Sequence, residues 1–455
     1  MENMQSIFKY SYMCLLALCL TLLSCKKFLE EKPLKEQFLP STTEDLQALL
    51  DNPGNTDSDP ALLEILSDEY YITPAYWQGL SADLALNYTW SLNDVPYDPS
   101  WALPYQRPIY YSNIVLDHLA TLKLPDDTKS REIKGTALFY RANAFFNLAQ
   151  LFAKPYDEST LSDLGIVLRT TSDINEKSKR ATIKETYDKI ISDLNEAANL
   201  LPKATEAPTR PTKAAVYAVL SRVYLTMRDY NNTLKYADLA LQKHNMLLDF
   251  NNLVPGIPFN IFNAEVIFHS RASVTSILST SNAKIDPALL SIYNQFDLRK
   301  TILFKPNTGV NTGTFGFRGS YFGTEGPWLV FTGTATSEMF LIRAECYARK
   351  GEKEKAVSDL NTLLAKRMDK NHWIPIDPSV VNEPLALVLA ERRKELVFRG
   401  LRWMDVRRLN MEGANITLKR VINGTEYSLL PNNNRWVALI PYDVISRSGI
   451  QQNPR

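Results

Sequence analysis

The 455-residue sequence has few cysteines and few histidines, four of each. Cys14 and Cys19 lie in an apolar N-terminal run, Cys25 ends that run, and Cys346 stands alone in the rest of the chain. If the mature chain begins at Cys25 and the Cys25 thiol is modified, Cys346 is its one remaining free cysteine, and no intramolecular disulfide can form. Its stability would then depend on a buried core, which a chain longer than about 250 residues can form.

Sequence motifs for common catalytic and metal sites are also missing. The histidines are His118, His244, His269 and His372. They are widely scattered and form neither an HExxH motif nor another i, i+4 pair, so a zinc site of that kind is not predicted. No G-x-S-x-G or G-x-x-x-x-G-K sequence occurs, and Cys346 lies in a helical pattern that predicts a core position. The sequence therefore predicts no catalytic residue, no metal site and no cofactor.

An excess of charge of one sign is absent as well. The 51 Lys and Arg residues balance 50 Asp and Glu residues, which gives a net charge of +1. This balance predicts neither a nucleic-acid partner nor a polybasic membrane patch, because both need a basic surface. Binding must then depend on a localised site.

One apolar run, Tyr10–Leu23, stands near the N-terminus and is shorter than the roughly 20 residues of a transmembrane helix. It ends in Leu22-Leu23-Ser24-Cys25, a pattern typical of bacterial lipoprotein signals that are cleaved before the cysteine. We therefore predict that residues 1–24 are a signal peptide and that Cys25 is the lipidated first residue. The alternative is an ordinary secretory signal with a chance cysteine.

Helical periodicity recurs in antiparallel pairs with the spacing of tetratricopeptide repeats. One pair has Tyr217, Leu220, Ser221 and Tyr224, followed by Thr233, Ala237 and Ala240, and a second has Phe340, Ala344 and Tyr347, followed by Ala356, Leu360 and Leu363. In such repeats small residues allow two helices to cross closely, and larger residues fill the space to the next hairpin. We predict a mainly α fold with a tetratricopeptide-like scaffold in segments of about 109–152, 182–243, 335–368 and 385–409. Unrelated amphipathic helices are the alternative.

Three long segments between these helices lack clear periodicity: about 51–108, 245–334 and 412–455. Loops of this length in a compact domain are usually functional or contain structure of their own. Residues 265–268 and 301–304 are predicted to be short strands. The scaffold is therefore expected to have a large irregular, loop-rich ligand face with minor short strands.

Four features in sequence order resemble one family. They are the start Cys25-Lys26-Lys27-Phe28-Leu29-Glu30-Glu31-Lys32-Pro33, the W-x3-Y-x3-I-x3-N spacing of Trp101, Tyr105, Ile109 and Asn113, the run ERRKELVFRGLRWMDVRR at 391–408, and the closing Pro441 with Gln452-Asn453-Pro454. Together they resemble the RagB/SusD family of nutrient-uptake outer-membrane lipoproteins, essentially from end to end. Arg399 departs from the pattern, because the family usually has Glu there.

The resemblance implies a single SusD-like domain over residues 25–455, anchored by lipid in the outer membrane of the cell and exposed at its surface. It further implies a protein that binds oligosaccharides or polysaccharides without cleaving them. The bound glycan would be delivered to a partner, a SusC-like TonB-dependent outer-membrane transporter.

Paired carboxylates could instead mark a glycosidase, and the obvious pairs are Glu391 with Glu395 and Asp68 with Glu69. The basic residues near Glu391 and Glu395 in sequence are Arg392, Arg393, Arg399 and Arg402. They predict an ion-pair network that keeps these carboxylates ionised, rather than an acid/base pair.

Sugar recognition needs flat aromatic faces for the C–H surfaces of pyranose rings and polar groups for the hydroxyls. The irregular segments supply both, and the predicted ligand-binding residues are Tyr76, Trp77, Asp83, Asn87, Trp90, Arg318, Tyr321 and Trp328. Trp101 is predicted to point into the core, because its helical register matches that of Tyr105 and Ile109. A peptide-binding importer subunit and a tetratricopeptide scaffold for protein interactions are the alternative functions.

Overall fold

The computed structural model describes residues 40–455, apart from 92, 96, 123–125, 206, 274 and 327–328. The chain forms two compact units, Met1–Thr42 and Thr43–Arg455, and every helix and strand named below belongs to the second. The predicted signal peptide, Cys25 and Trp328 lie outside the described residues.

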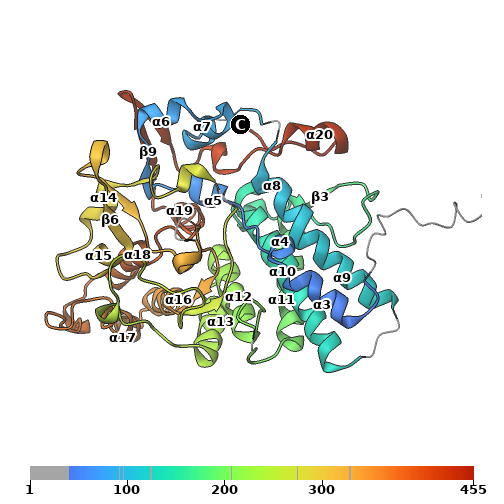
Figure 1. Cartoon of the computed structure of the whole chain (residues 1–455), viewed down its shortest axis with the longest axis horizontal. Helices are drawn as coiled ribbons and strands as arrows, with labels where there is room; N and C mark the ends of the chain where they lie inside the picture. Colours follow the sequence, from blue (N-terminus) through green and yellow to red (C-terminus); the bar gives the residue numbers. More distant parts are fainter. Residues whose placement is uncertain are drawn as a thin grey trace, which may run out of the picture. The chain divides into compact units, whose positions relative to one another are not determined.

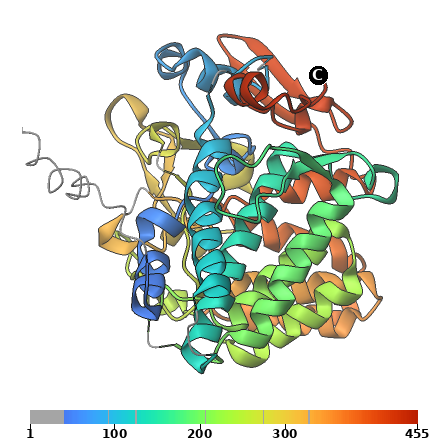
Figure 2. The same ribbon diagram turned by 90° about the vertical axis from the view of Figure 1, so that its right-hand side faces the viewer.

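Helices form the scaffold of the second unit (Figure 1). They are α9 (Tyr110–Thr121), α10 (Thr128–Phe152), α11 (Ile183–Leu200), α12 (Lys213–Met227), α13 (Tyr230–Lys243), α16 (Thr336–Arg349), α17 (Lys353–Leu364), α18 (Pro384–Glu395) and α19 (Arg402–Asn410). Successive helices from α9 to α13 pack on one another, α13 packs on α16, and α16 packs on α17 and α18. Figure 2 shows α9 to α13 side by side. The predicted mainly α, tetratricopeptide-like scaffold is confirmed.

The hairpin of α12 and α13 shows how the sequence builds this scaffold. Arg228 ends α12 in the left-handed conformation with a φ of 62°, and the Asp229 carboxylate accepts a hydrogen bond from the Asn232 N–H to begin α13. The buried small residue Ala237 lets the two helices approach. The rings of Tyr224 and Tyr236 then stack with centroids 5.5 Å apart.

Shorter helices fill the segments between the scaffold helices. They are α3 (Thr43–Asp51), α4 (Pro53–Thr56), α5 (Leu62–Ile65), α6 (Pro74–Gln78), α7 (Ala82–Tyr88), α8 (Pro99–Pro104), the π-helical turn η1 (Tyr105–Ile109), α14 (Pro287–Ser291), α15 (Arg299–Leu303) and α20 (Tyr442–Ser448). Short 3₁₀ turns lie at Glu158–Thr160, Phe250–Asn252, Ser276–Leu278, Gly309–Asn311, Gly323–Glu325, Pro378–Val380 and Asn434–Trp436.

The strands form two-stranded antiparallel pairs. The pairs are β1 (Tyr70–Tyr71) with β5 (Lys284–Ile285), β2 (Leu164–Val167) with β3 (Arg180–Thr182), β4 (Val266–Phe268) with β8 (Thr334–Ala335), β6 (Phe304–Pro306) with β7 (Phe315–Phe317), and β9 (Leu418–Ile422) with β10 (Thr425–Leu429). The strand predicted at 265–268 is confirmed as β4 for residues 266–268. The strand predicted at 301–304 is wrong for its first three residues, which belong to helix α15. There the N–H groups of Thr301 and Ile302 donate to the Leu298 carbonyl.

The β9–β10 hairpin lies in a segment that the sequence analysis treated as irregular. Asn423 and Gly424 form its turn with φ values of 50° and 81°. An Asn-Gly pair is the strongest short-range signal for such a two-residue turn, because both residues tolerate positive φ. The Asn423-Gly424 pair is thus a local sequence signal for this hairpin.

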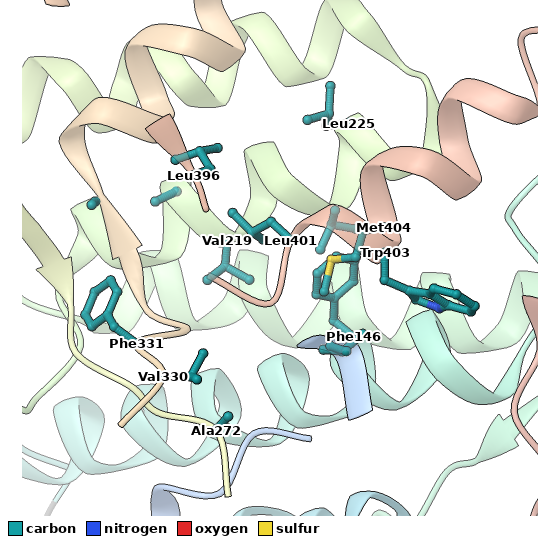
Figure 3. Close-up of a cluster of buried hydrophobic side chains, with 14 of the residues drawn as sticks. Phe146, Val219, Leu225, Ala272, Val330, Phe331, Leu396, Leu401, Trp403 and Met404 are labelled. Carbon is teal, nitrogen blue, oxygen red and sulfur yellow. The ribbon is translucent and has the colours of Figure 1, made fainter. Parts of the chain in front are cut away.

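The core joins the scaffold to the C-terminal helices. Figure 3 shows Phe146 of α10 and Val219 of α12 in one cluster with Leu401, Trp403 and Met404. Cys346 is fully buried in α16, as predicted, and burial raises the pKa of its thiol to about 12.

Candidate ligand surface on α6, α7 and β10

Four of the predicted ligand residues lie on two short helices, α6 and α7. The Thr73 side chain begins α6 by accepting a hydrogen bond from the Tyr76 N–H, and Pro74 occupies the first helical position, where proline is favoured. Tyr76 and Trp77 follow, both half-buried. The capped start of α6 therefore fixes the backbone that carries these two rings.

Trp77 connects three segments of this surface. Its indole N–H donates to the carbonyl of Ala85 in α7 at 3.2 Å, and its ring lies 6.5 Å from that of Tyr427 in β10, at an interplanar angle of 45°. The Tyr76 hydroxyl donates to the Ser276 hydroxyl at 3.0 Å. Figure 1 and Figure 2 show α6 and α7 beside the β9–β10 hairpin.

Asp83 and Asn87 supply polar groups on the same helix, α7. They are four residues apart and therefore share one face, and both are half-buried. Within the described residues, neither side chain makes a hydrogen bond to the protein, so both can bond a ligand. We call Tyr76, Trp77, Asp83, Asn87 and Tyr427 the α6–α7 surface.

Tyr427 was not among the predicted ligand residues, because it belongs to the overlooked hairpin. Recognition of the Asn423-Gly424 turn would have placed Tyr427 in a strand, but nothing local to either segment brings it to Trp77. That contact depends on how α6 and β10 fold together.

Trp90 is not part of an exposed surface, contrary to the prediction. It is 4% exposed, its indole N–H donates to the Leu66 carbonyl at 3.1 Å, and the guanidinium of Arg420 lies 4.6 Å from its ring centroid. Arg420 comes from β9, more than three hundred residues away. A partner so distant could not be foreseen from the loop sequence around Trp90.

Tyr321 is also a core residue rather than an exposed platform. It is 1% exposed, its hydroxyl donates to a Glu265 carboxylate oxygen at 2.8 Å, and Arg399 lies 3.7 Å from its ring centroid. Burial raises the pKa of Tyr321 above its usual range. Arg399, the departure from the family pattern, thus contacts an aromatic face.

Arg318 is half-buried and is already engaged with the protein. Its Nε donates to the Ile302 carbonyl at 3.3 Å and its terminal nitrogen to the Thr301 carbonyl. These carbonyls lie in the last turn of α15, where no intrahelical donor is available. Arg318, a predicted ligand residue, thus uses two of its donor nitrogens to cap a helix.

Glu391 and Glu395 belong to an ion-pair network, as predicted, but with other partners than those expected from sequence. Glu391 contacts Arg299 at 2.6 Å and Lys394 at 2.7 Å, and Glu395 contacts Arg367 at 2.8 Å. Burial alone would raise the pKa of both carboxyls, but the cations outweigh it and lower both values. Both groups are thus held ionised.

Asp68 and Glu69 are adjacent in sequence, but their carboxyl groups lie in different electrostatic environments. Burial opposes ionisation of Asp68, yet Arg402 at 2.6 Å, with Arg393, lowers its pKa to about 2. Glu69 is 2% exposed, and burial next to Glu64 raises its pKa well above the usual value. Neither carboxyl lies on the α6–α7 surface.

No cluster of three or more His, Cys, Asp or Glu side chains with metal-site geometry occurs in the described part of the chain. Among the same residues, no helix combines the length and the apolar character that crossing a membrane requires.

The fold is that of the SusD superfamily of structures. A SusD superfamily protein from Bacteroides thetaiotaomicron superposes with a TM-score of 0.75 at 22% identity, covering 91% of this chain and 100% of its own. Another from Bacteroides vulgatus gives 0.74 at 21% identity, covering 91% and 99%. A SusD-like carbohydrate binding protein from Bacteroides vulgatus gives 0.67 at 18% identity, covering 90% and 97%.

Sequence comparison gives the same family. Residues 27–225 match the family model described as "Starch-binding associating with outer membrane", and residues 336–454 match the model described as "SusD family". SusD-like protein P2 of Formosa agariphila is 31% identical over 134 residues, a match that spans 28% of this chain and 25% of that relative. The chain belongs to the SusD/RagB family.

Proposed function

We propose that this protein is a non-catalytic, glycan-binding lipoprotein of the outer membrane that delivers oligosaccharides to a SusC-like TonB-dependent transporter. The observation that carries the proposal is the match of both chain ends to SusD-family models, one of them described as starch-binding and associated with the outer membrane. The sequence Leu22-Leu23-Ser24-Cys25 supports lipid anchoring at Cys25.

The α6–α7 surface is the proposed glycan site. Trp77 and Tyr427 offer aromatic rings from two segments, and Asp83 and Asn87 of the neighbouring helix α7 offer uncommitted acceptors and donors. Aromatic faces bind the apolar sides of sugar rings, while amides and carboxylates bind their hydroxyls. Of the predicted ligand residues, Tyr76, Trp77, Asp83 and Asn87 remain in this proposal, together with Trp328, which lies outside the described residues.

A non-catalytic role agrees with the state of the paired carboxylates. Glu391, Glu395 and Asp68 have lowered pKa values and are ion-paired, whereas a glycosidase acid needs a raised pKa. Glu69 has a raised pKa, but it is buried and its Oε2 accepts the Phe398 N–H at 2.7 Å.

The test compares Trp77→Ala with Trp373→Ala by affinity electrophoresis in gels that contain soluble starch or another neutral polysaccharide. Trp373 is also half-buried but follows α17, which lies far from α6 in Figure 1. We expect Trp77→Ala to weaken retention about tenfold, because stacking contributes about 0.5–1.5 kcal/mol beyond buried area. Trp373→Ala should be retained like the wild type, and equal retention of both variants would exclude this site.

A further inference from the structure

The structure contains a cleft that is separate from the α6–α7 surface. It encloses about 510 Å³, within the roughly 300–1,000 Å³ typical of small-molecule sites. Its walls come from three segments: α8 with η1 and the start of α9, the β2–β3 loop at 168–179, and Pro441 with the start of α20. It shares no lining residue with the α6–α7 surface.

The helical wall of the cleft contains an irregularity. Residues Tyr105–Ile109 form a π-helical turn, η1, which follows Pro104 and contains Pro108. Such turns occur as single bulges in α-helices and are frequent at functional sites. Here the turn places Tyr105, Gln106 and Ile109 along the cleft.

The base of the cleft is aromatic and fixed. Trp101 is 4% exposed, and its ring centroid lies 5.1 Å from that of Tyr105 and 4.9 Å from that of Phe152. The Tyr105 hydroxyl donates to the Val167 carbonyl at 2.8 Å. The prediction that Trp101 points inward is confirmed, and half-buried Tyr110 and half-exposed Tyr97 extend the aromatic lining outward.

The wall formed by the β2–β3 loop is held in place by hydrogen bonds to α9 within the protein itself. The buried Asn113 amide donates to the Arg169 and Thr171 carbonyls, each at 3.0 Å, and Asp117 accepts the Ser172 N–H at 2.7 Å. These bonds attach the β2–β3 loop to α9. A preformed wall lowers the entropy cost of binding.

The charges in the cleft select against anions. Arg169 is the single cation of the lining, and its donors are engaged by the Ser178 hydroxyl at 3.0 Å and the Asp173 carbonyl at 3.3 Å. Two carboxylates, Asp173 and Asp443, also line the cleft. An anionic sugar would therefore meet net negative charge, whereas neutral hydroxyls can donate to these carboxylates.

We propose that this cleft is a second saccharide site, which takes one or two units of a neutral oligosaccharide on the rings of Tyr97, Tyr105 and Tyr110. The inference rests on the proposed glycan-binding function and adds a site that none of the predicted ligand residues lines. Gln106 and Asp443 bond the hydroxyls, and α20 closes the outer side.

The test measures binding stoichiometry by isothermal titration calorimetry with neutral hexasaccharides: maltohexaose, cellohexaose, xylohexaose and mannohexaose. Hexagalacturonate is the anionic probe. Tyr110→Ala removes a cleft ring, and Ala102→Trp fills the cleft from its α8 wall. The matched control is Tyr442→Ala, since Tyr442 is 59% exposed on α20 and does not line the cleft.

We expect the wild type and Tyr442→Ala to bind two neutral ligands, and both cleft variants to lose one of them or to bind it about tenfold more weakly. If the wild type binds one ligand, and this binding is lost in Trp77→Ala but kept in the cleft variants, the second site is overturned. The proposed function would still stand. Preferred binding of hexagalacturonate, or of extended peptides, at the cleft overturns the ligand class. Absence of all saccharide binding overturns both proposals.

Discussion

The guanidinium of Arg420 lies 3.6 Å from the ring centroid of Tyr88 and joins the C-terminal hairpin to the end of α7. The same group faces the rings of Trp90 and Tyr70 at 4.6 and 5.3 Å, and it donates to the Ile65 carbonyl at 2.9 Å. One buried cation thus packs against the end of α7, the helix that carries Asp83 and Asn87. Trp90 packs against this cation and is buried, whereas Trp77 is half-buried.

Replacing Arg420 by alanine should destabilise the protein. The change removes a cation between aromatic rings and leaves backbone carbonyls without a donor, so we expect a loss of about 2–4 kcal/mol in the free energy of unfolding. Chemical denaturation measures it. Lys419→Ala is the control, because Lys419 is exposed and pairs with the exposed Glu426, and it should change stability by about 0.5 kcal/mol or less. Equal effects of the two substitutions would contradict this role of Arg420.

Glu64 and Glu69 form a buried carboxyl pair that should make stability depend on pH. They share a hydrogen bond, and burial raises both pKa values, that of Glu69 well above its usual 4.5. The folded state therefore holds a proton that the unfolded state releases above about pH 4.5. Stability from this pair is complete below that pH and is lost as pH rises through the raised pKa of the folded state.

Glu69→Gln tests this sign, because the amide keeps a donor for Glu64 and does not ionise. The variant should gain stability relative to the wild type as pH rises from about 5 to 8, as followed by thermal melting across that range. Exposed Glu383→Gln is the control and should follow the wild-type curve. A constant difference between Glu69→Gln and the wild type at all pH values would show that the pair does not hold a proton.

Cys25 should determine where the protein is found in the cell. Cys25→Ser removes the thiol that a lipoprotein signal acylates, so we expect the protein to leave the detergent-extracted membrane fraction. Cys346→Ser changes a buried thiol of the folded chain and should remain in that fraction. The intact mass of the extracted wild type should correspond to a lipid-modified chain that begins at Cys25, and an unmodified N-terminus would contradict anchoring.

The scaffold could be predicted from sequence because its signals are local. Helical periodicity, the turn at Asp229 and the small residues of α12 and α13 all act within a few residues of one another. The Asn423-Gly424 turn was equally local and was available to sequence reasoning.

The ligand residues were harder to predict because their exposure depends on distant partners. Trp77 and Trp90 both stand near loops, but only Trp90 meets Arg420. Tyr321 is buried under Arg399 in the same way. The second cleft joins η1, the β2–β3 loop and α20, which no pattern within one segment connects.

We propose that this chain binds a neutral oligosaccharide at its surface and leaves it intact. Native mass spectrometry of the protein with a hexasaccharide that it retains tests this most directly. We expect a complex with the summed mass of chain and whole hexasaccharide, from which prolonged incubation releases only the intact sugar. Shorter fragments, or no complex with any saccharide, would contradict it.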